Sequence, residues 1–518
     1  MKQMSENKQI FIATIINYIT FGINILIAIF YTPFLLKTLG DSDYGIRAFA
    51  TSFVTYTNLI GSGVAAAYLR FANIKKKEHG DEGVKDVDGI FLKIFLVLGI
   101  INLVIGGILF LLFFGKVIPL HGYSDSQIFV VATVVLLSFI TLGIKLPASV
   151  FILILNFKRK FIFRNTRYLL SGLFEYALSM VCLLLGITVF KSQVIALSLV
   201  SLISEVLFSL ITFIYLFSLL KHRLNFKQKV VEKTIWKDII KFSFLALLIV
   251  AVMTLNDSTD RIILGFISPE SVTFYSLAIV FNAYIKTAVD SVSVLYTPKI
   301  TEEATNNEHE KLQSTYDFVS KICVIILSLI VFGFVCCGRE FIMMWLGSDR
   351  EEIYYYSLPL MLGMIFLYPQ HFSIQVHRAS GKQKFAAISL SLTFLLNVAL
   401  SIGLVIILSH YTNPVLGCII GTLFTYVCES FLLSYYNSKK LHLKQSATWY
   451  QVLINALIGF MISIVVLRSF DLLDLNIRPV FIMIIKGVVY VILFIAVQMA
   501  VNKDTIMKFL RRKKNDKV

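Results

Sequence analysis

The sequence predicts an all-α, polytopic membrane protein with about fourteen transmembrane helices. Of its 518 residues, 57% are hydrophobic and only 15% are charged, whereas soluble domains carry about one charged residue in four. Mean hydropathy is correspondingly high, at +0.80. Apolar runs recur along the whole chain, and each has the roughly 20 residues that a helix needs to cross a hydrocarbon core of ~30 Å.

The expected spans follow one another with short connections. They cover approximately residues 10–36, 45–69, 89–114, 126–157, 166–190, 193–220, 238–264, 271–297, 315–337, 353–376, 384–408, 413–436, 448–468 and 479–500. The first run has no small-residue cleavage site after it, so we interpret it as a retained span and not as a signal peptide.

Lys and Arg are distributed unevenly between the two sides of the predicted membrane. With the N-terminus inside, 36 of the 48 basic residues fall in the inner segments and nine in the outer ones. Because basic residues favour the cytoplasmic side, both termini are expected in the cytoplasm. The net charge of +17 then reflects topology and contact with anionic membrane lipids, so we expect no nucleic-acid partner.

Two halves of the chain are related by a shift of 228 residues, which places residues 32–50 over residues 260–278. This predicts a six-helix lobe over residues 1–228, a second over 229–440, and two further helices with a basic tail over 441–518. Six spans per lobe give both lobes the same orientation, a parallel repeat that is typical of transporters working by alternating access.

Catalytic and metal-binding motifs are missing from the sequence. It has no P-loop and no G-x-S-x-G nucleophile elbow. Its six cysteines fall in or beside spans without metal-ligand spacing. The connecting segments are too short for a soluble domain. We therefore expect no enzyme, no metal site and no bound cofactor, and coupling of transport to H⁺ or Na⁺ is left open.

Three segments carry a resemblance to a known family: PFLLKTLGDSDYGIRAF, TDRIILGFISPESVTFYSLA and RASGKQKFAAISLSLTFLLNVALSIGL. They resemble the corresponding regions of bacterial polysaccharide exporters of the Wzx flippase type, in the multidrug/oligosaccharidyl-lipid/polysaccharide exporter superfamily. The resemblance implies a multi-pass protein of the bacterial cytoplasmic membrane. Its implied substrate is an undecaprenyl-pyrophosphate-linked oligosaccharide moved to the outer leaflet for surface polysaccharide, such as lipopolysaccharide or capsule, with other assembly proteins as further candidate partners.

Ionisable side chains inside or beside the spans are the candidate substrate and cavity residues. A charge at the bilayer centre costs roughly 2.5 to 3.5 kcal/mol, so these side chains are expected to face protein or water. The candidates are Arg47, Arg70, Lys145, Glu175, Glu205, Asp257, Asp260, Arg261, Lys286, Asp290, Glu429 and Lys486.

Internal pairing is one interpretation of these charges, and a hydrated cavity for a phosphorylated glycan lipid is another. Lys286 and Asp290 lie four residues apart on one helix, and so do Asp257 and Arg261. Lys145 differs because no acid lies within four residues of it and Pro147 follows closely. Lys145 is therefore the strongest candidate for pyrophosphate recognition, with Glu175 and Glu205 as its candidate partners.

A gate is a further hypothesis from the charges of the seventh span. Asp257, Asp260 and Arg261 share one helix face near its outer end. We expect Asp257 and Arg261 to pair within the helix and Asp260 to meet Arg47 of the other lobe in the inward-facing state. The alternative is that the cluster only anchors the helix end at the lipid headgroups.

Two other functions remain as alternatives. A drug or metabolite antiporter of the same superfamily shares the fold but is expected to have an acid-dominated cavity, whereas mid-span cations occur here in both halves. A glycan polymerase or ligase is expected to carry a large outer loop with catalytic residues, and the short outer connections disfavour it.

Overall fold

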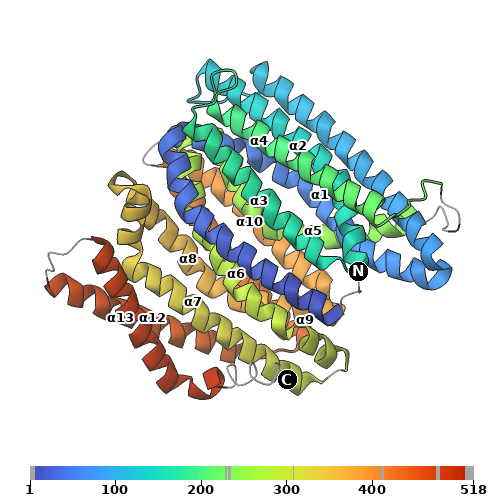
Figure 1. Cartoon of the computed structure of the whole chain (residues 1–518). Helices are drawn as coiled ribbons and strands as arrows, with labels where there is room; N and C mark the ends of the chain where they lie inside the picture. The colour runs from blue at the N-terminus through green and yellow to red at the C-terminus, as the bar shows by residue number, and fades with distance from the viewer. Residues whose placement is uncertain are drawn as a thin grey trace. The chain divides into compact units, whose positions relative to one another are not determined.

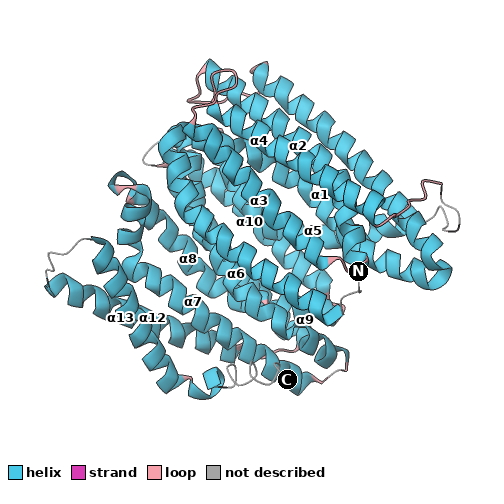
Figure 2. Cartoon of the chain, in the orientation of Figure 1, coloured by secondary structure: helices cyan, strands magenta, loops and turns pink. Residues whose placement is uncertain are grey.

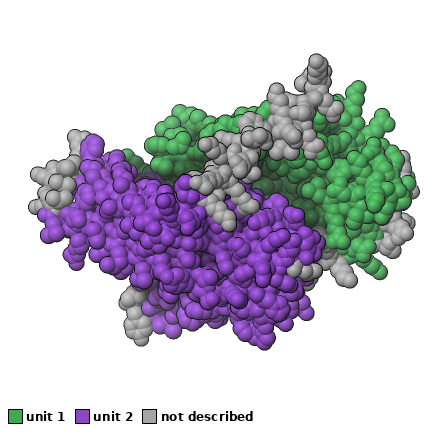
Figure 3. All heavy atoms as spheres, turned by 90° about the horizontal axis from the view of Figure 1, so that it is seen from below, with its two compact units in different colours: residues 1–273 green, residues 274–518 purple. Residues whose placement is uncertain are grey.

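The structure of the chain is a computed structural model. It describes residues 6–227, 230, 235–306, 308–409, 413–473 and 479–507. Throughout these residues the secondary structure is helical, without a β-strand (Figure 2). The backbone packing divides the chain into two compact units, residues 1–273 (unit 1) and 274–518 (unit 2), coloured separately in Figure 3.

Unit 1 is built from the first five α-helices and a short π-helix (Figure 1). They are α1 (Glu6–Phe114), α2 (Asp125–Phe157), α3 (Phe161–Leu184), α4 (Gln193–Ile214), η1 (Tyr215–Leu219) and α5 (Ile235–Gly265). Helix α1 packs against α2, α3 and α5, and α2 packs against α4.

Helix α1 is continuous by hydrogen bonding but contains three of the expected spans. Gly40 and Gly80 interrupt it with positive φ angles of 77° and 59°, a conformation that costs glycine little and most other residues much more. These two glycines redirect the chain between the spans. A polar residue begins the next helix, because Ser124 caps α2 and exchanges hydrogen bonds with Gln127 in a capping box.

Unit 2 contains the remaining helices, with the boundary between the units close to the start of α6. They are α6 (Pro269–Thr305), α7 (His309–Leu346), η2 (Ser348–Arg350), α8 (Glu352–His371), α9 (Ser373–Ala379), α10 (Gln383–Ser409), α11 (Pro414–Leu441), α12 (Ser446–Leu473) and α13 (Pro479–Val501). Helix α7 packs against α8, α12 and α13, and α11 packs against α8 and α10.

Each expected span coincides largely with a helix, although the span over 166–190 extends beyond the end of α3 and the span over 353–376 is divided between α8 and α9. Ten helices in the described part of the chain are long and apolar enough to cross a membrane, and α1 is one of them. The prediction of an all-α polytopic membrane protein is confirmed. The predicted boundaries of the repeat at residues 228 and 440 stay a prediction, since division by contacts groups α5 with unit 1.

Candidate functional site

A polar cavity of about 230 Å³ lies among α1, α2 and α4 of unit 1. Two of the predicted site residues, Arg47 on α1 and Lys145 on α2, line it together. The other lining residues are Thr51, Val54, Thr55, Asn58, Ser138, Thr141, Leu142, Ser198 and Ser201.

The cavity is polar because each helix contributes a stripe of polar residues at helical spacing. On α1, Arg47 is followed by Thr51, Thr55 and Asn58 at intervals of three or four residues. Such residues share one face of a helix. The stripes of α2 and α4 repeat this pattern with Ser138, Thr141 and Lys145, and with Ser198 and Ser201.

Hydroxyl groups around the cavity already donate hydrogen bonds within their own helices. Thr51 donates to the carbonyl of Arg47 at 2.9 Å, Ser138 to that of Val134 at 2.7 Å and Thr141 to that of Leu137 at 2.8 Å. A hydroxyl has only one hydrogen to donate. Charged donors for an anion in this cavity are therefore the side chains of Arg47 and Lys145.

Neither cation is neutralised by a described side chain. Lys145 is exposed to the cavity and Arg47 is half-buried. The part of the chain that the structure describes gives neither of them an ion pair. Two uncompensated cations at one membrane-embedded cavity favour a negatively charged ligand.

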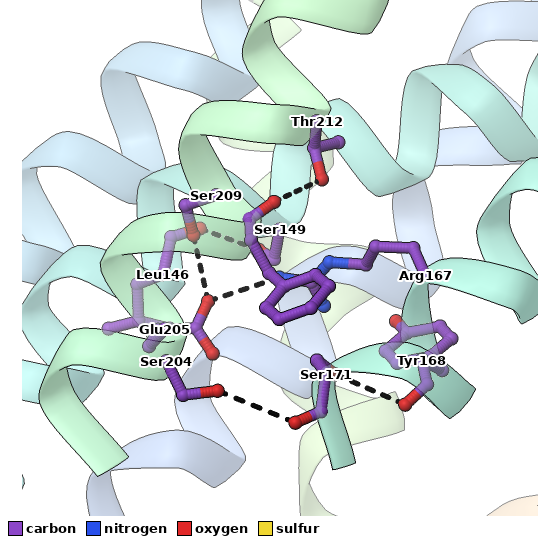
Figure 4. Close-up of polar contacts among 10 residues, drawn as sticks. Leu146, Ser149, Arg167, Tyr168, Ser171, Ser204, Glu205, Ser209 and Thr212 are labelled. Atoms are coloured by element: carbon purple, nitrogen blue, oxygen red, sulfur yellow. Dashed lines mark hydrogen bonds and ion pairs between the residues drawn. The ribbon is translucent and has the colours of Figure 1, made fainter. Parts of the chain in front are cut away.

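Glu175 and Glu205 are not the partners of Lys145. Glu175 on α3 accepts a hydrogen bond of 2.6 Å from the Ser201 hydroxyl, so it lies next to a residue of the cavity wall. Glu205 on α4 is 3.3 Å from Nη2 of Arg167 on α3 and also accepts a hydrogen bond from Ser209 at 2.8 Å, as Figure 4 shows. Arg167 is largely buried, and this pairing compensates its charge.

The α3–α4 contact contains further polar bonds beside that pair. Ser204 donates to the carbonyl of Ser171 at 3.4 Å, and Ser171 donates to the carbonyl of Tyr168 at 3.1 Å (Figure 4). This network holds the face of α4 that carries Ser201 toward the cavity.

The predicted gate residues belong to unit 1. Asp260 is fully buried, and the Arg261 Nε is buried without a hydrogen-bond partner. The Asp257 side chain lies outside the described residues, so its pairing with Arg261 stays a prediction. Arg47 forms no ion pair with a described residue, so a gate contact between Arg47 and Asp260 also stays a prediction. Arg70 is exposed, away from the cavity lining.

In unit 2, the buried Glu429 on α11 pairs with a histidine. Its Oε1 lies 2.7 Å from Nε2 of His371 on α8, and its Oε2 accepts a hydrogen bond of 3.2 Å from Thr393 on α10. Three helices thereby meet at one carboxylate. Nearby, Asp290 on α6 is within electrostatic range of Lys286 and His371, although no Lys286–Asp290 ion pair is present in the described residues.

Lys486 on α13 is buried and forms an ion pair of 2.6 Å with Glu340 on α7. It also lies over the Phe470 ring at 5.9 Å. This contact joins the last predicted span to the body of unit 2, and it compensates a charge that the sequence placed within a span. In the described residues, no group of three or more His, Cys, Asp or Glu side chains has the arrangement of a metal site.

Arg167 and His371 are the partners of two predicted site residues, Glu205 and Glu429, and sequence reasoning missed both. Arg167 lies near the predicted start of the span over residues 166–190, and neither it nor His371 has an acid at helical spacing that would indicate its partner. The neutral polar stripe of α1 was readable from the sequence, because its three- and four-residue spacing is helical. Its partners on α2 and α4 were not, since the sequence does not say which helix faces which.

Similar folds belong to known membrane transporters. A structure titled as the lipid II flippase MurJ in an inward closed conformation has a TM-score of 0.71 at 15% identity, covering 95% of this chain and 99% of that one. An inward-facing multidrug resistance MATE transporter of the MOP superfamily has a TM-score of 0.62 at 14% identity, covering 77% and 91%. The chain thus shares the fold of these two multi-pass membrane transporters.

The family is shown by sequence. The family model described as "Polysaccharide biosynthesis protein" matches residues 34–354, and the chain belongs to that family. None of the curated proteins matches the sequence. The resemblance to polysaccharide exporters stated above is confirmed at the level of the family.

Proposed function

We propose that the protein flips a lipid-linked oligosaccharide, with an undecaprenyl pyrophosphate carrier, across the cytoplasmic membrane by alternating access. The observation that carries the proposal is the placement of Arg47 and Lys145 at one polar cavity without a compensating acid in the described residues. A pyrophosphate group supplies the negative charge that these cations lack. Membership of the polysaccharide biosynthesis family supports a glycan as the cargo.

Cavity size indicates which part of such a substrate binds there. At about 230 Å³ the cavity is smaller than the roughly 300–1,000 Å³ typical of sites for drug-sized ligands. It therefore suits the pyrophosphate and not the whole glycan. Charge also distinguishes this function from export of cationic drugs, because Arg47 and Lys145 repel a cation.

Replacement of Lys145 tests the proposal. We expect Lys145→Ala to insert normally and to lower flipping at least about tenfold, since a hydrogen bond to a charged group contributes about 1.5–3 kcal/mol. Lys145→Arg should restore part of the activity. The measurement uses proteoliposomes with a synthetic undecaprenyl-pyrophosphate-linked sugar, scored by access of an external hydrolase.

Lys37→Ala is the matched control, because Lys37 is an exposed lysine of α1 that does not line the cavity. It should flip like the wild type. Normal flipping by Lys145→Ala would remove Lys145 from the mechanism. Wild-type transport of ethidium without transport of the lipid-linked sugar would favour the antiporter alternative.

A further inference from the structure

A second cavity of unit 1, about 300 Å³ in volume, is dominated by cations. It lies where three segments predicted to face the cytoplasm meet: the part of α1 after Lys75, the end of α2 and the chain after η1. We call it the basic cavity. Its cationic lining residues are Lys76, Lys85, Lys158, Lys221 and Arg223.

The wall of this cavity is fixed by contacts between α1 and the chain after η1. The Asn225 side chain donates to Glu82 at 3.0 Å and to Asp86 at 2.9 Å, and the Val230 amide donates to Asp86 at 2.8 Å. Gly89 allows this approach, because a Cβ there would lie 2.1 Å from the Asn225 carbonyl oxygen. The segment carrying Lys221 and Arg223 is thus held against α1.

Two acids beside the basic cavity, Asp88 and Glu82, already have partners within the protein. Asp88, fully buried, accepts a hydrogen bond of 2.5 Å from the Tyr68 hydroxyl and lies 2.9 Å from the His222 ring nitrogen. Glu82 pairs with Lys85 at 2.6 Å. The remaining lining acid, Asp81, is an exposed residue.

Four of the cations have no ion pair among the described residues, and one of them, Lys76, lies instead over the Phe157 ring at 5.4 Å from its centroid. The other three are Lys158, Lys221 and Arg223. Burial lowers the pKa of Lys158, although Asp88 and Asp81 act in the opposite direction. Burial therefore disfavours the protonated form of Lys158, and an anion bound beside it would stabilise that form.

We propose that the basic cavity is a binding site for a phosphate group, held by Lys158, Lys221 and Arg223. Arginine presents a planar fork that binds phosphate oxygens in pairs, and lysine adds a mobile point charge. A phosphate at the inner membrane surface comes either from an anionic lipid headgroup or from a soluble phosphate compound. The site is built from residues other than Arg47 and Lys145, so it does not rest on the flippase proposal.

The test compares a pocket variant with a matched surface variant in the full-length protein. The pocket variant is Lys158→Gln with Arg223→Gln. The control is Lys77→Gln with Lys227→Gln, which removes two exposed lysines of the same segments that do not line the cavity. Both are made in the Lys145→Ala background, so that binding at the first cavity does not contribute.

Two probes distinguish the sources of phosphate. Inorganic pyrophosphate is titrated into protein in neutral detergent by calorimetry, and retention of phosphatidylglycerol over phosphatidylcholine is measured by native mass spectrometry. We expect the control to bind like its parent. The pocket variant should bind at least one probe about tenfold or more weakly, and Lys221→Gln alone should lower binding of that probe by a smaller factor.

The affected probe identifies the ligand. Loss of pyrophosphate binding alone indicates a soluble phosphate, and loss of phosphatidylglycerol retention indicates a lipid headgroup. The proposal is overturned if the parent binds neither probe, or if the pocket variant binds both as tightly as the control does.

Discussion

The polar cavity of unit 1 and the two buried pairs of unit 2 differ in how their charges are compensated. In unit 1, Arg47 and Lys145 stand at a polar cavity with no ion pair among the described residues. In unit 2, the buried Glu429 and Lys486 have the partners His371 and Glu340. An uncompensated charge in a membrane costs roughly 2.5 to 3.5 kcal/mol. A cost of this size points to a ligand in unit 1, whereas pairing in unit 2 points to helix packing.

Removing Glu429 from the His371–Glu429 pair of unit 2 should give the largest loss of stability. Glu429→Ala leaves His371 without its partner, whereas the Thr393 hydroxyl keeps the backbone carbonyls of Ser389 and Leu390 as acceptors. Breaking a buried pair costs about 3–5 kcal/mol. We expect the unfolding midpoint in detergent to fall by several degrees in a thermal melt. Glu310→Ala, at an exposed acid of α7, should leave the midpoint unchanged.

A double variant sharpens this reading of unit 2. If the pair is structural, His371→Ala with Glu429→Ala should cost less than the sum of the two single changes, because neither group is left alone. Loss of transport at full stability would instead give unit 2 a direct role in the cycle.

Neutralising both cations of the polar cavity should lower transport without lowering stability. Arg47→Gln with Lys145→Gln is expected to lower flipping roughly 100-fold or more, since each charged contact contributes about 1.5–3 kcal/mol. The unfolding midpoint should stay the same or rise, because no pair is broken. A marked fall in the midpoint would show that these cations support packing, as the charges of unit 2 do.

Lys486→Met tests whether the α7–α13 contact is only structural. Methionine keeps much of the apolar stem but leaves Glu340, 22% exposed, without its partner. Because the Glu340 side chain remains partly exposed to solvent, we expect Lys486→Met to lower the free energy of unfolding by about 1 kcal/mol, measured by chemical unfolding. Flipping should be unchanged. A transport defect without destabilisation would contradict this assignment.

The smallest effect is expected from the gate hypothesis. Asp260 is fully buried and Arg47 is half-buried, and we expect Asp260→Asn alone to lower the flipping rate about fivefold, which corresponds to roughly 1 kcal/mol. We expect Arg47→Gln and Asp260→Asn together to be no worse than the more damaging single variant. Fully additive losses, measured at equal insertion, would exclude a direct contact.

The sequence determined the membrane class, the positions of the spans and the candidate charges, because these depend on local composition and on helical periodicity. The sequence also singled out Lys145, because the absence of an acid within four residues can be seen from the sequence alone. Conversely, the sequence did not show that Arg167 pairs with Glu205 or that His371 pairs with Glu429.

The tertiary structure determines these two pairings. The residues of the Arg167–Glu205 pair are 38 positions apart and those of the His371–Glu429 pair are 58 apart, so neighbouring helices and their rotation decide whether they meet. The same packing brings the polar stripes of α1, α2 and α4 to one cavity. Periodicity fixes which residues share a face, but only helix–helix packing selects the face that each of them meets.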